Sequence, residues 1–155
     1  YVPALDIGED EALTENTAVL QYVADARREA GLLPPVGSNG RYRTLQWLGY
    51  VATELHSKVF AILFTPGASD ETKAAARELA KSRLQRLSHH LQGREFLTDS
   101  FSIADCYLLA VLNWFEYAGL DIKAWPVLEA YRARLRGRPS VIQAMAAEQP
   151  LLHAY

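Results

Sequence analysis

His56 is the side chain of this sequence best suited to take part in chemistry. It lies in a stretch whose apolar residues recur at spacings of three and four, which predicts a long helix. At about 100° per residue the apolar residues share one arc, whereas Thr53, His56 and Phe60 fall on the adjoining arc. An imidazole at this boundary can donate a hydrogen bond to a thiolate and lower its pKa. The residues alone favour the other interpretation, a histidine held by a backbone or carboxylate partner.

Two short segments near the start of the sequence could bind an extended ligand. A cis bond before Pro3 would leave the amide and carbonyl of Val2 free to pair with a peptide, although a trans proline on an edge strand is the common case. Glu15 and Asn16 stand where the first helix is expected to begin, and a helix N-terminus can bind a carboxylate. Thr14 or Asn16 as a plain N-cap is equally well supported.

Aromatic residues in the second half of the sequence could form the wall of an apolar pocket. Trp114 and Tyr117 lie late in a strongly apolar stretch, and Phe60 shares the helical arc of His56. Buried aromatic residues on a central helix more often belong to the core than to a pocket. Both interpretations stay open on the residues alone.

The first 31 residues predict a β-hairpin followed by one helix. Residues 1–7 and 12–14 have the apolar character of short strands, and the spacing changes to three and four from about Glu15. We expect residues 32–40, which include Pro34, to be a linker. Because two strands bury little surface, we also expect this unit to be part of a larger domain, with the sequence beginning inside a longer protein.

Residues 41–155 predict an all-helical domain. Its first long helix ends before Pro66. Ser102 and Asp105 have the spacing of a capping box, which is a structural role, and they precede a helix over residues 103–118. That helix is apolar on nearly every side, so it should run through the centre of a helical bundle. Two shorter helices follow, each with proline in its first turn.

Composition excludes several classes of protein. The chain has 155 residues and a net charge of -2, which argues against a nucleic-acid partner. No apolar run is long enough to cross a membrane. The single cysteine, Cys106, rules out a disulfide framework and is expected to be a buried, inert thiol. His89 and His90 diverge on one helix, so we expect no metal site, and we expect a cytoplasmic protein.

Taken in order, these motifs resemble those of the cytosolic glutathione transferases. The resemblance rests on Val-Pro-Ala-Leu at residues 2–5, Leu-Thr-Glu-Asn at 13–16 and Phe-Ser-Ile-Ala-Asp at 101–105. It is most similar to the bacterial beta class, because Thr-Glu-Leu-His occupies residues 53–56 and Trp114 lies late in the central helix. The separations between these motifs are more specific to the family than any single motif is.

The resemblance implies the C-terminal half of a thioredoxin-like domain followed by an all-helical domain, without the βαβ unit that carries the family's catalytic residue. It implies a homodimer that conjugates the thiolate of glutathione to small electrophiles in detoxification, without a metal. A glutathione-dependent disulfide reductase and a non-catalytic binding or dimerisation module are the alternatives.

The resemblance also assigns roles to single residues. Val2 and Pro3 would hold the cysteinyl part of glutathione, Glu15 and Asn16 its γ-glutamyl part, and His56 would stand beside the sulfur.

Thr53 and Glu54 would reach glutathione bound to the neighbouring subunit, although Glu54 and Lys58 also have the spacing of a simple surface ion pair. The pocket for the second substrate would be formed by Phe60, Trp114 and Tyr117.

Overall fold

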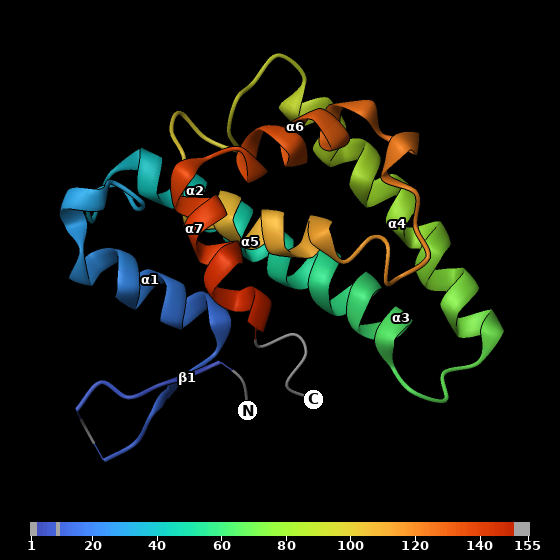
Figure 1. Ribbon diagram of the computed structural model, residues 1–155, viewed down its shortest axis with the longest axis horizontal. Helices are drawn as coiled ribbons and strands as arrows, with labels where there is room; N and C mark the ends of the chain where they lie inside the picture. Colours follow the sequence, from blue (N-terminus) through green and yellow to red (C-terminus); the bar gives the residue numbers. More distant parts are fainter. Residues whose placement is uncertain (1–2, 9, 151–155) are drawn as a thin grey trace.

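A small hairpin and one helix lie at one side of a bundle of longer helices (Figure 1). The computed structural model describes residues 3–8 and 10–150. The helices are α1 (Asn16–Ala26), α2 (Asn39–Tyr50), α3 (Ala61–Phe64), α4 (Asp70–Leu91), α5 (Ile103–Asn113), α6 (Pro126–Arg136) and α7 (Pro139–Glu148), with short 3-10 turns at Arg28–Ala30 and Ile122–Ala124. The predicted fold class, mostly helical with a small sheet, is confirmed.

The hairpin consists of β1 (Ala4–Leu5) and β2 (Leu13–Thr14), which pair antiparallel. Ala4 stands opposite Thr14, and Leu5 stands opposite Leu13. The connection contains Gly8 at a φ of 80°, a left-handed conformation that glycine adopts without steric cost. Helix α1 begins directly after β2, so the hairpin fixes where the first turn of α1 lies.

The first long helix contains a central segment with wider turns than an α-helix, which the sequence did not predict. Residues Val51–Phe60 (η2) are π-helical and continue α2 into α3, with the amide of Ala61 donating to the carbonyl of His56. A π-turn closes on the fifth residue instead of the fourth, so Phe60 lies over Leu55 and is buried with it. The expectation that Phe60 lies with His56 on the arc adjoining the apolar one is therefore wrong, because that arc was drawn for a regular α-helix.

Helix α5 lies at the centre of the bundle and packs against α2, η2 and α6. Its capping box is present, with the amide of Ser102 donating to Asp105 at 2.9 Å. The helix ends at Asn113 rather than continuing to residue 118. Turns whose hydrogen bonds span three to five residues follow it, and Gly119 has a φ of 66°. The prolines expected in the first turns of two shorter helices are found at Pro126 and Pro139.

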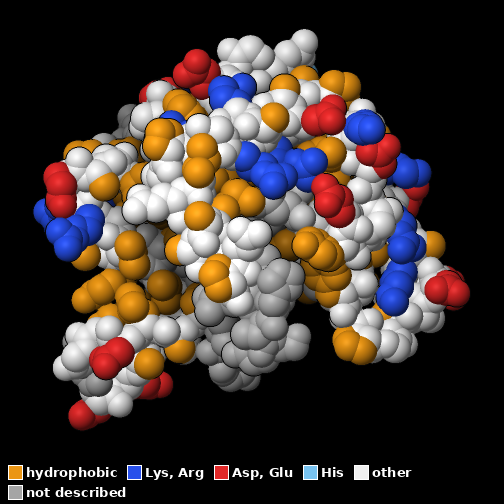
Figure 2. Space-filling view, viewed as in Figure 1, with side chains coloured by type: hydrophobic (Ala, Val, Ile, Leu, Met, Phe, Trp, Pro, Cys, Tyr) orange, Lys and Arg blue, Asp and Glu red, His pale blue; other side chains and the backbone are white. Residues whose placement is uncertain are grey.

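Charged and apolar side chains are distributed unevenly over the surface. On the face shown in Figure 2, charged side chains gather along α4, whereas apolar side chains are exposed along α1, where Tyr22 and Val23 are both exposed. In the part of the chain that the structure describes, every helix is too short or too polar to span a bilayer.

Candidate functional site

A hollow of about 790 Å³ separates the hairpin and α1 from α2, η2 and α5. The sequence-predicted residues that line it are Pro3, Glu15, Asn16, Thr53, His56 and Trp114. They come from four segments that are far apart in the chain. Val2 was predicted to act with Pro3, and it lies outside the described residues.

His56 reaches this hollow from η2 and binds a tyrosine of α5. Its Nδ1 lies 2.5 Å from the hydroxyl oxygen of Tyr107. Burial lowers the pKa of His56 below the usual value for histidine, so the imidazole is neutral at pH 7. A neutral imidazole has one nitrogen that accepts and one that donates, so it can serve as a hydrogen-bond donor without carrying charge.

Helix α1 presents its N-terminus to the same hollow. Glu15 is the N-cap residue and Asn16 is the first helical residue, so neither Thr14 nor Asn16 caps the helix. Glu15 has a φ of 67°, which is strained for a residue other than glycine, and its side chain makes no capping bond. Its carboxylate therefore stays available at a helix end whose amides can bind an anion.

Trp114 is the aromatic wall of the hollow. Its ring meets the ring of His56 edge to face at 4.9 Å between centroids and that of Phe64 at 6.0 Å. Phe60 packs against Trp114 at 5.8 Å from the core side and is not among the lining residues. Tyr117 is 80% exposed and does not line the hollow either, because α5 ends before it.

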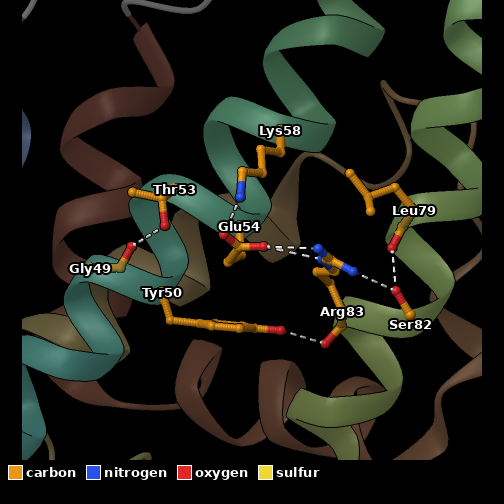
Figure 3. A network of polar contacts seen from close by, with 8 residues as sticks. All are labelled: Gly49, Tyr50, Thr53, Glu54, Lys58, Leu79, Ser82 and Arg83. Carbon is orange, nitrogen blue, oxygen red and sulfur yellow. Dashed lines mark hydrogen bonds and ion pairs between the residues drawn. The ribbon is translucent and has the colours of Figure 1, made fainter.

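Thr53 and Glu54 lie on neighbouring faces of η2 (Figure 3). Thr53 donates to the carbonyl of Gly49 at 3.0 Å and lines the hollow. Glu54 points away from it toward α4, where its two oxygens accept from Lys58 at 2.5 Å and from Arg83 at 3.1 Å. The hydrogen bond from Lys58, followed by that from Arg83, holds the pKa of Glu54 below its usual value. Glu54 is therefore ionised and fixed in place.

Ser102 and Asp105 lie away from the hollow and are fully buried. Burial, followed by the nearby charge of Asp105, raises the pKa of the Cys106 thiol to about 11, so this thiol is unreactive at neutral pH. Over residues 3–8 and 10–150, no three His, Cys, Asp or Glu side chains are grouped so that they could hold a metal ion.

Tyr107 belongs to this site, and the sequence did not predict it. It lies in the helix predicted to be apolar on nearly every side, and it is only 7% exposed. A buried tyrosine needs a partner for its hydroxyl, and this requirement was the available signal. The partner could not be named from the sequence, because His56 is 51 residues away.

Comparison with known proteins identifies the family. The model of the glutathione S-transferase C-terminal domain matches residues 50–139. The glutathione S-transferase GstA of Escherichia coli O157:H7 is 38% identical over 148 residues, which are 95% of this chain and 73% of that protein. A sphingomonad glutathione S-transferase solved with glutathione has a TM-score of 0.89 and 44% identity, over 96% of this chain and 74% of that one.

A second solved structure narrows the comparison to a class. The bacterial beta class glutathione S-transferase of Sphingomonas chungbukensis has a TM-score of 0.89 and 43% identity, again over 96% of this chain and 74% of that one. This likeness agrees with the motifs around His56 and Trp114. The chain belongs to the glutathione S-transferase family.

Proposed function

We propose that this protein binds glutathione in the hollow and transfers its thiolate to small electrophiles. The observation that carries the proposal is the convergence of a helix N-terminus, a neutral histidine and a tryptophan ring on one cavity. Family membership supplies the ligand, since a similar protein has been solved with glutathione bound.

The tripeptide would be held mainly by the N-terminal side of the hollow. The first turn of α1 offers its amides and the side chain of Asn16 to the γ-glutamyl carboxylate, and Glu15 offers a carboxylate to the ammonium group. Val2 and Pro3 would pair with the cysteinyl backbone in the manner of an added strand. This arrangement leaves the sulfur directed toward the helical side of the hollow.

His56 would act on the sulfur from that side. An N–H of the neutral imidazole donates to the thiolate and so lowers the pKa of the glutathione thiol, whose proton passes to solvent. The thiolate then attacks the electrophilic carbon, an S–C bond forms, and the leaving group departs with its electron pair. The electrophile would lie against Trp114, with Phe64 beside it and Phe60 supporting the ring from the core.

The active form would be a cytoplasmic homodimer that serves in detoxification. Thr53 and Glu54 lie on η2, and Lys58 and Arg83 hold Glu54 toward α4, outside the hollow of its own chain. A residue fixed in this way can contact glutathione in a second copy. Sedimentation equilibrium tests the dimer, and Glu54→Gln should weaken glutathione binding if the second copy contributes the contact.

Two measurements test the proposed function. Calorimetric titration with reduced glutathione should show saturable binding, and 1-chloro-2,4-dinitrobenzene should then be conjugated. The variant His56→Ala should lower kcat strongly, whereas its melting temperature should change little. Binding without turnover of any electrophile would indicate a non-catalytic module, and reduction of a glutathione mixed disulfide without conjugation would indicate a reductase.

A further inference from the structure

The hydroxyl of Tyr107 joins the two sides of the hollow. It lies 2.5 Å from Nδ1 of His56 on η2, and the side chain of Asn16 at the start of α1 lies near enough to act on the pKa of Tyr107. Side chains from α1, η2 and α5 therefore lie around this hydroxyl group. Tyr107 as a whole is 7% exposed, and it lines the hollow.

The direction of these hydrogen bonds follows from the protonation of each group. Burial raises the pKa of Tyr107, so the phenol keeps its proton and can donate it. Burial lowers the pKa of His56, so the ring is neutral and one nitrogen must accept. Among the described residues, Nδ1 of His56 is the only acceptor within hydrogen-bond distance of the Tyr107 hydroxyl, so the O–H proton of Tyr107 is directed at Nδ1. The ring proton of His56 then resides on Nε2.

The surroundings of the imidazole hold it in this orientation. The ring of Tyr107 meets it edge to face at 5.9 Å, and the ring of Trp114 meets it at 4.9 Å. Within the described part of the chain, Nε2 has no hydrogen-bond partner, and His56 lines the hollow. The donor of His56 is thus left for a bound ligand.

We propose that Tyr107 is a positioning residue that fixes His56 as the Nε2–H tautomer, so that its single N–H donor serves the sulfur of glutathione. The last clause rests on the proposed function, whereas the tautomer does not.

The tautomer can be measured directly by NMR. Long-range proton–nitrogen spectra of protein labelled with 15N in histidine distinguish a protonated from an unprotonated ring nitrogen. In the wild-type protein, Nδ1 of His56 should resonate as the unprotonated nitrogen. In Tyr107→Phe, which keeps the ring and removes only the hydroxyl, the two tautomers should become mixed. A wild-type Nδ1–H tautomer, or an unchanged spectrum in Tyr107→Phe, would overturn the proposal.

Tyr50→Phe is the matched control. Tyr50 is a half-buried tyrosine on α2, and its hydroxyl donates to the carbonyl of Arg83 at 2.9 Å, away from His56 (Figure 3). Its removal should leave the tautomer unchanged. If Tyr107→Phe does not fold, the wild-type spectrum decides alone: an unprotonated Nδ1 of His56 supports the proposal, and a protonated Nδ1 overturns it.

Kinetic measurements distinguish a failure of this proposal from a failure of the proposed function. Tyr107→Phe should lower kcat by about 10-fold to 100-fold, as expected when a catalytic group loses its position, while the KM for glutathione changes little. A fall in kcat accompanied by a comparable rise in the KM for glutathione would contradict a positioning role. If the wild-type protein conjugates nothing, the proposed function fails, and the NMR result still decides whether Tyr107 sets the tautomer.

Discussion

Arg41 of α2 donates two hydrogen bonds to the carboxylate of Asp25 on α1. Its Nη1 and Nη2 lie 2.9 and 2.6 Å from the two carboxylate oxygens. The same guanidinium donates to the carbonyl of Pro34 at 3.2 Å, between the two helices. This paired geometry holds α1 against the helical bundle. Because Asn16 is at the other end of α1, the ion pair also helps to set the width of the hollow.

Asp25→Asn should therefore weaken glutathione binding as well as lower the melting temperature. The hydrogen bond from Arg41 lowers the pKa of Asp25 below its usual 3.8. The stabilisation is complete above that value and is lost as the pH falls through the folded pKa. Melts from neutral pH down to about pH 3 should show the wild type and the variant converging at the acidic end. Glu29→Gln, which removes an exposed pair with Arg27, should change neither property.

Asp105 is expected to be the most costly polar residue to remove. It is fully buried and accepts from the amides of Leu97 and Ser102, and from the hydroxyl of Tyr131 at 2.6 Å. Asp105→Ala should lower the free energy of unfolding by about 3 kcal/mol, because several buried donors lose their acceptor. Tyr131→Phe should cost about 1 kcal/mol. Urea denaturation measures both, and a change in relative electrophile preference would contradict a purely structural role.

The protonation of His56 should appear in the pH dependence of stability. Because burial lowers its pKa, the unfolded chain takes up the proton more readily. The free energy of unfolding should then fall as the pH drops below the usual value of 6.5, and level off below the folded pKa. His56→Gln should remove this slope in urea titrations between about pH 5 and pH 8, whereas His89→Gln, at an exposed position on α4, should keep it.

Trp114→Ala should raise the KM for an apolar electrophile by roughly 10-fold, because the aromatic wall of the hollow is removed. The Kd for glutathione should stay close to that of the wild type. Tyr117→Ala is the control, since this side chain is 80% exposed and does not line the hollow. Equal effects of the two variants on KM would show that the electrophile binds elsewhere.

Local patterns predicted much of this fold. Helix starts are set by contacts within one turn, so the capping box of Ser102 and Asp105 and the prolines at residues 126 and 139 could be identified from the sequence. Apolar spacing likewise predicted the hairpin, the first helix and the central position of α5. The motifs at residues 2–5, 13–16 and 101–105 indicated the family, and those around His56 and Trp114 indicated the class.

Packing between distant residues decided the rest. The π-helical form of Val51–Phe60 moved Phe60 into the core, and α5 stopped at Asn113, which left Tyr117 at the surface. The bond between His56 and Tyr107 spans 51 residues and exists only because η2 and α5 pack together. The spacing of apolar residues shows which face of a helix is apolar. It does not show which residue across the core a buried hydroxyl will bind.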